Sequence, residues 1–367
     1  MSSKQDIGNT FTRESGEIHL GGIDALVRLT LDQVRTDARR GLKTGMFVSG
    51  YRGSPVGMLD AALIKQQKLL LEHHIKFVDG LNEDLAATAV WGTQMMHTVG
   101  KQKFDGVTGM WYGKAPGVDR SGDALKHANY TGIGKNGGVL AIVGDDPSCK
   151  SSSLCSQSEP MLFHVGIPSL YPANVQEILD YGLHGYNMSR NAGVWVGMKI
   201  VTNVADGTGT ASVDPSRLNF VTPDMMFDGQ KFTPNMNLGM NVRVEALEME
   251  QSLYTRRLEV AKRYARENKL NNVIFPNPNA WLGIMTAGKT YNDLRQAFLE
   301  MGLDDDALRH YGIRILKMGM LFPMEPTIVR EFAEGLEEIF VIEEKRPFLE
   351  MFAKQVLYGR ANAPRIV

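Results

Sequence analysis

Short apolar runs that alternate with amphipathic segments restrict this chain to a small set of folds. The runs at residues 46–48, 75–78, 107–111, 139–143 and 194–201 are rich in Val, Ile, Met, Phe and Trp, and glycine or polar residues close them, as expected of buried strands. The segments 23–41, 56–73, 123–130 and 174–190, and one that begins at Glu83, predict helices between these strands. Repeated strand, turn and helix units favour an α/β fold with a doubly wound parallel sheet.

The chain changes character after residue 205. Residues 206–235 are dominated by glycine, proline and polar side chains, which predicts a connecting segment. A charged helix is expected over residues 244–268, long enough to pack along a domain edge. Its apolar stripe would consist of Leu247, Tyr254, Leu258, Ala261 and Ala265.

A second α/β unit begins near residue 273. Strands are expected at residues 281–287, 313–318 and 339–343, and helices at 290–301, 325–337 and 347–358. The predicted organisation is a polar leader at 1–19, a first domain at 20–240, a linker helix at 241–272 and a second domain at 273–367.

Charge and cysteine content exclude several classes of protein. Lys and Arg number 40 against 41 Asp and Glu, so no global field attracts nucleic acid or an anionic membrane surface. No apolar run approaches the ~20 residues of a membrane span, and residues 1–16 have no apolar signal-peptide core, so the cytoplasm is the expected location. Cys149 and Cys155 are the 2 cysteines, too few to ligate a cubane iron–sulfur cluster without another chain.

Glu83 occupies a conspicuous position. Asn82 is a suitable N-cap, and Glu83 falls in the first turn of a segment that carries little further charge through Gly92. Because helices that are apolar on nearly every face are buried, we expect Glu83 at the mouth of a buried helix. Two interpretations are open: an acid favoured by the helix dipole, or a catalytic carboxylate.

Four further stretches carry a family resemblance in the same order. They are residues 49–55 (Ser-Gly-Tyr-Arg-Gly-Ser-Pro), 111–123 (Trp-Tyr-Gly-Lys-Ala-Pro-Gly onwards), 125–129 (Leu-Lys-His-Ala-Asn), and 144–148 (Gly-Asp-Asp-Pro-Ser) running on to 156–159. With residues 80–92 they resemble the N-terminal part of the indolepyruvate ferredoxin oxidoreductases, a family of 2-oxoacid:ferredoxin oxidoreductases. The resemblance is close over residues 20–205 and looser to the end.

The resemblance implies a fold and a cofactor. The first domain would be a pyrimidine-binding thiamine diphosphate domain, and the second a transketolase C-terminal-like α/β domain. In the family the helix-opening Glu binds the aminopyrimidine ring, where a carboxylate favours the imino tautomer that the reaction uses. Such a Glu must be partly desolvated, so that it shares its proton with the ring rather than with water.

Further site residues follow from the resemblance, each beside a structural alternative. Gly53 and Asn82 would contact the cofactor with Glu83. Ser54 and Arg52 stand where the family has Thr and Pro, so a hydroxyl is kept and a cation is added near the substrate carboxylate; a turn that needs no ligand is the alternative.

The Lys126-His127 pair matches one in the family. The resemblance assigns a substrate contact to Lys126 and a catalytic contact to His127, although a satisfied structural histidine is equally open. We expect Ser54, Glu83 and His127 to converge at the carboxyl edge of one parallel sheet. The loop after residue 144 would border the site and help to build a subunit interface, but it departs from the family after Ser148, so its residue roles stay open.

Several expected pieces of machinery are missing from the sequence. The Gly-Asp-Gly motif with Asn-Asn about 26 residues later, which in thiamine enzymes binds the diphosphate through a metal, does not occur. No metal ligands are therefore assigned here; Mg²⁺ and iron–sulfur clusters are expected on a pyrophosphate-domain and cluster-bearing partner chain or continuation past Val367. The Gly-x-Gly-x-x-Gly at 132–137 precedes a strand and does not predict a dinucleotide site.

The function that follows is one part of an oxidoreductase. It would decarboxylate indolepyruvate or another aryl 2-oxoacid on thiamine diphosphate, transfer the acyl group to coenzyme A and pass electrons to ferredoxin. A homo-oligomer is expected, inactive without the missing parts. The alternatives are a split non-redox thiamine enzyme, of the decarboxylase or transketolase type, and a catalytically inactive assembly fragment.

Overall fold

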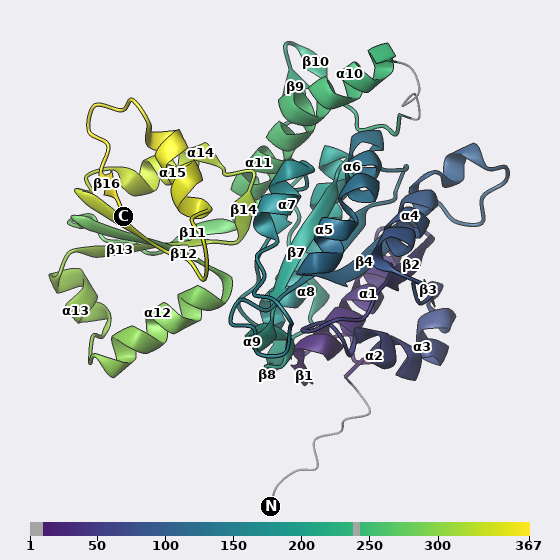
Figure 1. Ribbon diagram of the computed structural model, residues 1–367, viewed down its shortest axis with the longest axis horizontal. Coiled ribbons are helices and arrows are strands. Elements are labelled where there is room, and N and C mark those ends of the chain that lie inside the picture. Colours follow the sequence, from purple (N-terminus) through teal and green to yellow (C-terminus); the bar gives the residue numbers. More distant parts are fainter. Residues whose placement is uncertain (1–9, 238–242) are drawn as a thin grey trace, which may run out of the picture.

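A seven-stranded sheet forms the centre of the first α/β unit in the computed structural model, which describes residues 10–237 and 243–367 (Figure 1). Its strand order is β14-β6-β7-β5-β4-β2-β3, and all neighbours are parallel except β14 and β6. The strands are β2 (Thr44–Gly50), β3 (Ile75–Phe77), β4 (Gly106–Lys114), β5 (Val139–Asp145), β6 (Ser169–Leu170), β7 (Trp195–Val201) and β14 (Met320–Phe322). The predicted parallel sheet is confirmed.

Helices cover both faces of this sheet. One face packs against α1 (Gly22–Arg39) and α8 (Val175–Ala192), and the other against α4 (Glu83–Gln94), α5 (Ala115–Arg120) and α6 (Gly122–Thr131). Strand β5 shows the division: Leu140 and Ile142 join the core on the α1 side, whereas Val139, Ala141 and Val143 join the core on the α4 side. This alternation explains why each strand reads as a continuous apolar run.

The second α/β unit has its own sheet of five strands, in the order β11-β13-β12-β15-β16. They are β11 (Asn271–Phe275), β12 (Leu282–Ala287), β13 (Ile313–Met318), β15 (Glu338–Ile342) and β16 (Arg365–Ile366), and β11 is the antiparallel edge. The helices of this unit are α12 (Gly288–Glu300), α13 (Asp305–His310), α14 (Pro326–Ala333) and α15 (Leu349–Leu357). An α/β unit in this region was predicted, and the strand positions agree within one or two residues.

Two connections could not be placed from the sequence. Strand β1 (Glu17–Gly21), at the end of the predicted leader, pairs antiparallel with β8 (Thr208–Ser212), inside the predicted connecting segment. A short β9 (Met226–Phe227) and β10 (Gln230–Lys231) pair follows. Residues 1–9 of the leader and the predicted boundary at 240 lie outside the described residues.

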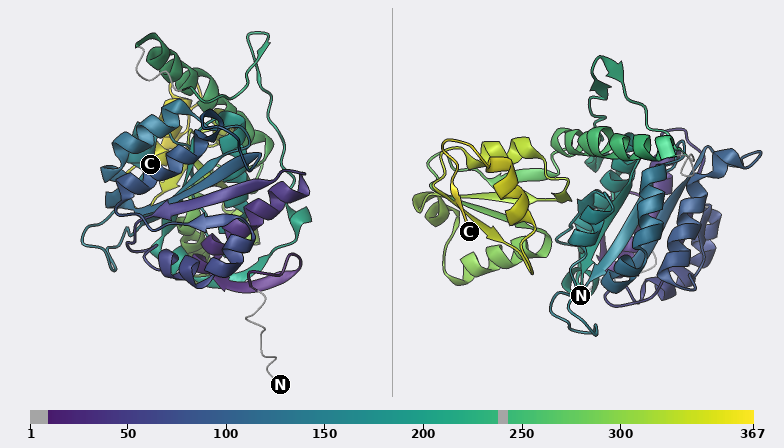
Figure 2. Two further views of the ribbon diagram at one scale, coloured as in Figure 1. Left: turned by 90° about the vertical axis from the view of Figure 1, so that its right-hand side faces the viewer. Right: turned by 45° about the horizontal axis from the view of Figure 1, so that its top comes forward.

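The predicted linker helix is one rod with three parts. It consists of α10 (Arg243–Ser252), a π-helical turn (Leu253–Arg257) and α11 (Leu258–Glu267), and Figure 2 shows it lying across the top of the structure. The apolar stripe prediction is right for Leu258, Ala261 and Ala265, which are buried. It is wrong for Leu247 and Tyr254, which are 57% and 47% exposed because the first half of the rod projects past the sheet.

Two helix predictions need correction. The segment predicted as one helix over 56–73 forms α2 (Leu59–Lys65) and α3 (Gln67–Glu72), which are separated at Gln66. The expectation of a buried α4 is wrong: Glu83, Ala86, Ala87, Val90 and Gln94 are buried, but Leu85 is 52% exposed. Because α4 packs on β2 and β4 with one face only, its opposite face lies at the surface.

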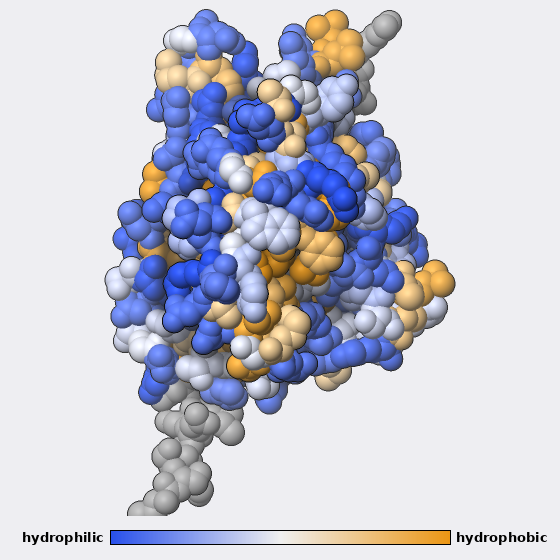
Figure 3. All heavy atoms as spheres, turned by 90° about the vertical axis from the view of Figure 1, so that its left-hand side faces the viewer, coloured by the Kyte–Doolittle hydropathy of each residue, from blue (hydrophilic) through white to orange (hydrophobic). Residues whose placement is uncertain are grey.

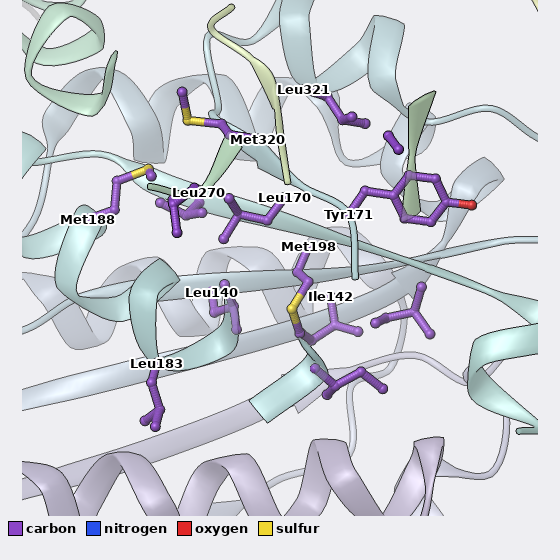
Figure 4. Close-up of a cluster of buried hydrophobic side chains, with 14 of the residues drawn as sticks. Leu140, Ile142, Leu170, Tyr171, Leu183, Met188, Met198, Leu270, Met320 and Leu321 are labelled. Carbon is purple, nitrogen blue, oxygen red and sulfur yellow. The ribbon is translucent and has the colours of Figure 1, made fainter. Parts of the chain in front are cut away.

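Buried residues of the two units pack together in one hydrophobic core. Strand β14 comes after β13 in sequence but pairs with β6 in the first sheet, so Met320 and Leu321 lie near Leu170 and Met188 (Figure 4). The outer face of the second unit carries a patch of apolar side chains at its centre (Figure 3). Exposed apolar residues of this unit include Trp281, Leu299, Met301, Phe340, Met351 and Tyr358.

A buried ionic cluster joins the units beside β5. Lys199 Nζ lies 2.7 Å from Glu159, 3.3 Å from Glu344 and 3.8 Å from Asp145. Tyr171 completes the cluster by donating a hydrogen bond to Glu344 (2.6 Å) beneath the lysine. Burial alone would lower the pKa of Lys199, but the surrounding acidic groups raise it well above its usual value. Burial also raises the pKa of Asp145 to about 6, against the opposing effect of Lys199.

We expect replacement of Asp145 by asparagine to change how stability depends on pH. The pKa of Asp145 is about 6 in the folded chain against a usual 3.8, so the stability that its neutral form contributes is complete below pH 3.8 and is lost as pH rises through 6. Between pH 3.8 and pH 6, the unfolding free energy of the wild type should therefore fall by roughly 1 to 3 kcal/mol relative to that of Asp145→Asn.

Urea unfolding at a series of pH values measures this difference. Asp306→Asn is the matched control, since the side chain of Asp306 is 92% exposed. A difference between wild type and Asp145→Asn that does not vary with pH contradicts the prediction.

Candidate active site at the carboxyl edge of the first sheet

The carboxyl ends of β2 and β4 and the turn before α4 meet at one edge of the first sheet. Gly80 donates a backbone hydrogen bond to Gly50 (3.0 Å), and Tyr51 donates one to Tyr112 (3.1 Å). A side chain at Gly50 would place Cβ 2.3 Å from the Tyr112 carbonyl oxygen, and one at Gly80 would place it 2.6 Å from the Gly50 carbonyl oxygen. These glycines allow three backbone segments to converge, so the Ser54 turn and Glu83 share this edge as expected.

Glu83 is held at the opening of α4. The predicted cap is confirmed, because Asn82 accepts a hydrogen bond from the Leu85 N–H (2.9 Å). The backbone oxygen of Glu83 accepts a hydrogen bond from Trp111 Nε1 (3.0 Å). Glu83 is only 6% exposed, yet no described residue donates a hydrogen bond to its carboxylate. Buried carboxylates normally have donors, so this group is prepared for a donor from outside the described chain.

Glycines of the neighbouring strand and helix leave room around Glu83. A Cβ at Gly117, in α5, would lie 2.5 Å from Glu83 Cγ and 2.6 Å from Oε1, and one at Gly113 would lie 3.4 Å from Cγ. Both glycines belong to the 111–123 stretch quoted above, but their contact with Glu83 could not be read from spacing. A Cβ at Gly53, which was predicted to bind the cofactor, would lie 2.7 Å from Cδ of Lys114, so the turn packs against the end of β4.

The two predicted substrate residues of the turn have different surroundings. Ser54 Oγ makes a hydrogen bond with the hydroxyl of Ser151, in the loop after β5. Arg52 has a side chain that is 63% exposed and lies 3.4 Å from both Asp60 and Asp79. Ser54 is therefore tied to the edge of the site, whereas two carboxylates hold Arg52 at the surface.

Asp146 organises the loop that contacts Ser54. Its carboxylate accepts hydrogen bonds from the N–H groups of Lys150 (2.9 Å), Ser151 (2.9 Å) and Ser152 (3.0 Å). Burial opposes ionisation, but these donors outweigh it and lower the pKa of Asp146 to about 2. Ser151 is a site residue that sequence reasoning missed; its only signal was its place in a loop that departs from the family pattern.

His127 and Lys126 are not brought next to Glu83. The ring of His127 lies 6.3 Å from that of Trp91, eight residues along α4 from Glu83, which corresponds to about 12 Å of helix. His127 Nδ1 donates a hydrogen bond to the Asp123 carbonyl oxygen (2.9 Å), and Lys126 Nζ lies 5.8 Å from the centre of the Tyr130 ring. Both side chains therefore sit on the flank of α4 and α6 rather than at the edge.

Residues 10–237 and 243–367 contain no group of three or more His, Cys, Asp or Glu side chains that could hold a metal ion. Cys149 and Cys155 are both free thiols in the loop after β5. Within the same part of the chain, no helix combines the length and apolar character that a membrane crossing requires.

Comparison with protein families identifies the second unit. Residues 271–366 match the indolepyruvate ferredoxin oxidoreductase middle domain. Indolepyruvate oxidoreductase subunit IorA of Methanothermobacter marburgensis is 27% identical over 320 residues, which are 87% of this chain and 46% of the relative. The corresponding subunit of Methanothermobacter thermautotrophicus is 25% identical over 94% of this chain and 49% of its own length. The chain thus spans about half the length of the curated relatives it matches.

Two solved structures share the fold across both units. A 2-oxoglutarate:ferredoxin oxidoreductase from Magnetococcus marinus, determined with 2-oxoglutarate, coenzyme A and succinyl-CoA bound, aligns with a TM-score of 0.66 at 16% identity over 96% of this chain and 62% of that one. A split gene transketolase, described as an inactive beta4 tetramer, aligns with a TM-score of 0.55 at 10% identity over 95% of this chain and 88% of that one. The α/β arrangement expected from the resemblance is confirmed, and the comparisons support the resemblance to the indolepyruvate ferredoxin oxidoreductase family, whose middle-domain model matches residues 271–366 and two of whose IorA subunits are 25% and 27% identical to this chain.

Proposed function

We propose that the chain is the pyrimidine-binding part of a thiamine diphosphate-dependent 2-oxoacid:ferredoxin oxidoreductase. The observation that carries the proposal is the Glu83 carboxylate, which is buried at the N-terminus of α4 without a hydrogen-bond donor among the described residues. A ring that presents a nitrogen to this carboxylate would supply the missing partner. When bound, thiamine diphosphate supplies the carbanion chemistry of 2-oxoacid decarboxylation.

The residues of this chain fit the ring end of that cofactor. Glu83 would hold or share a proton with a ring nitrogen, and its low exposure keeps water from competing for that proton. Gly113 and Gly117 make room for the Glu83 side chain itself, because Cβ atoms there would crowd it. Asn82 fixes the first turn of α4, and Gly53 lets the turn after β2 approach β4.

The diphosphate end must be held elsewhere. The sequence lacks the family's diphosphate motif, and no acidic, His or Cys cluster for a metal occurs in the described ranges. Exposed apolar side chains lie in the segments at the site edge: Met58 (66%), Leu81 (80%), Leu85 (52%) and Leu154 (69%). These support a proposal that a pyrophosphate domain, on a partner chain or a continuation, covers this edge and completes the site.

The remaining chemistry belongs to the assembled enzyme. We propose an aryl 2-oxoacid such as indolepyruvate as substrate, coenzyme A as acyl acceptor and ferredoxin as electron acceptor, with iron–sulfur clusters on the partner. Ser54, at the edge beside Ser151, is positioned to contact the substrate carboxylate, with Arg52 supplying charge from the surface. His127 and Lys126 take no step in this proposal, because they lie on the flank of α4.

Glu83→Gln in the enzyme purified with its partner chains is expected to reduce turnover. The amide can still form a hydrogen bond but cannot share a proton, and removing a positioned acid–base group typically costs ~10² to 10⁴ in rate. The dissociation constant for thiamine diphosphate should change far less, since most cofactor affinity would come from the diphosphate end. Steady-state reduction of ferredoxin at saturating cofactor measures the effect.

Asp84→Asn is the matched control. Asp84 lies in the same first turn of α4, but its side chain is 41% exposed and faces Arg120 at 3.7 Å. A helix-dipole role predicts equal, small stability losses of ~0.3 to 1 kcal/mol in both variants and normal turnover in both. Normal turnover of Glu83→Gln would leave Glu83 a structural acid. Turnover of 2-oxoacids without electron transfer would favour the alternative of a split non-redox thiamine enzyme. If the chain supported no turnover with any partner, the alternative of an inactive assembly fragment would be favoured.

Gly117→Ala tests the close packing of this glycine against the Glu83 side chain. The new methyl group would meet Glu83 Cγ at 2.5 Å and displace its side chain, so we expect weaker cofactor binding and lower turnover in the assembled enzyme. Gly92→Ala is the control: it is also a helical glycine, and its Cβ would meet no atom within 4 Å, so it should leave activity unchanged and stabilise α4 by roughly 0.5 to 1 kcal/mol. Equal activities of the two variants would contradict the proposed role of the Gly117 contact with Glu83.

The isolated chain should be colourless and bind thiamine diphosphate weakly. This follows because the cluster ligands and the diphosphate site are expected on a partner or continuation. Absorbance spectra and calorimetric titration with thiamine diphosphate and Mg²⁺ test it. Cluster absorbance, or tight Mg²⁺-dependent binding by this chain alone, would contradict it.

A further inference from the structure

A cavity lies away from the Glu83 edge, on the α1 side of the first sheet. It has a volume of about 250 Å³ and lies between the end of α1, the middle of α8, the segment around Glu14 and the loop around Arg217 and Phe220. Helix α1 ends at Arg39, just before β2 starts at Thr44, so the cavity is at the amino edge of the sheet. Neither the proposed cofactor nor the 2-oxoacid uses this region.

The lining of this cavity is strongly basic, although the chain as a whole is close to electrically neutral. Its lining includes four guanidinium groups, from Arg35, Arg39, Arg40 and Arg217, against the carboxylates of Glu14 and Asp32. The whole chain has a formal net charge of −1. Asp32 is already engaged by Arg28, whose Nη2 lies 3.1 Å from it. The cavity therefore concentrates positive charge locally, which is what an anionic ligand requires.

Two of these guanidinium groups have a buried nitrogen that makes no hydrogen bond to a described residue. Arg217 uses Nε for Asp180 (2.8 Å) and Nη1 for the Asp214 carbonyl oxygen (3.1 Å), but its buried Nη2 donates to no described residue. Arg35 has a side chain that is 7% exposed; its Nη2 donates to the Phe11 carbonyl oxygen (2.9 Å) and its Nη1 to Asp32 (3.4 Å). Its buried Nε makes no hydrogen bond to a described residue, although Glu14 Oε1 lies 3.3 Å away. Buried donors without acceptors are unfavourable, so a ligand with several acceptor oxygens would be stabilised here.

Glu14 partly occupies the place of such a ligand. Its Oε1 lies 3.3 Å from Arg35 Nε, and its Oε2 lies 3.7 Å from Arg39 Nη1. The Glu14 side chain is 56% exposed, so this carboxylate is held loosely and can leave. Burial also lowers the pKa of Arg40, whose guanidinium packs 4.9 Å from the centre of the Phe220 ring.

We propose that this cavity binds a small phosphate-bearing anion, which displaces the Glu14 carboxylate from Arg35 and Arg39. Guanidinium groups match phosphate oxygens through paired hydrogen bonds, and several converge on one space here. A volume of about 250 Å³ is below that of most drug-sized sites, which favours a ligand of one or two phosphate groups with a small body against Phe220. The site would be separate from the one at Glu83.

Pyrophosphate is the probe for the experiment. Calorimetric titration and thermal melts of the wild-type chain, at ionic strength held constant with NaCl, should show saturable binding and a raised melting temperature. Arg39→Gln should weaken binding at least tenfold. This variant should fold, because the Arg39 side chain is 41% exposed and its polar contacts among the described residues are with Glu14 and Thr36. Glu14→Gln should tighten binding several-fold, because it removes the competing carboxylate.

Arg13→Gln is the matched control for charge. Arg13 is exposed, belongs to the same N-terminal segment, and donates to the Glu17 carbonyl oxygen outside the cavity, so its loss should leave binding unchanged. Equal weakening by Arg13→Gln and Arg39→Gln would mean diffuse attraction and would overturn the proposal, as would weaker binding by Glu14→Gln or no binding by wild type. If a dicarboxylate such as 2-oxoglutarate bound as tightly as pyrophosphate, the assignment of a phosphate-bearing ligand would be wrong.

Discussion

The charge on Lys199 constrains the structure more than any other single group. An ammonium group in an apolar interior is stable only if anions surround it. The three carboxylates around this one come from β5, from α7 (Glu159–His164) and from the segment after β15. Satisfying that charge therefore fixes the second unit against the first. It also fixes Asp145, the residue before Asp146, and so the start of the loop that carries Ser151 to Ser54.

The same cluster illustrates the limit of reading this chain from its sequence. Most helices and the strands β2, β3, β4, β5, β7, β12, β13 and β15 were predictable, because apolar runs and N-caps such as Asn82 and Asn174 are local signals. The pairing of β1 with β8, the return of β14 to the first sheet, and the ionic contacts of Lys199 join residues far apart, and no local pattern encodes them. The wrong expectation of a fully buried α4 has a related cause: composition shows that a helix can be buried, not how many of its faces are covered.

The candidate site likewise has features that the sequence predicted and features that it did not. Glu83 and the Ser54 turn were placed at one edge because both follow strands that proved parallel neighbours, and that rule needs only the order of elements. The contact of Gly117 with Glu83, and that of Ser151 with Ser54, depend on how loops fold back and were not predictable. His127 lies in α6, whose rotation and position along α4 decide what it meets, so neighbouring sequence gave no basis for placing it beside Glu83.

The two edges of the first sheet have opposite character. At the carboxyl edge, loops after β2, β4 and β5 approach closely through glycines around an acid, Glu83, that accepts no hydrogen bond from the described residues. At the amino edge, the end of α1 brings Arg35, Arg39 and Arg40 together, and the first two of them lie beside Glu14. Within residues 10–237 and 243–367, the Glu83 carboxylate has no hydrogen-bond donor, and buried nitrogens of Arg35 and Arg217 make no hydrogen bond. Because such groups are unfavourable inside a folded protein, each is better explained by a molecule that binds there than by the stability of this chain alone.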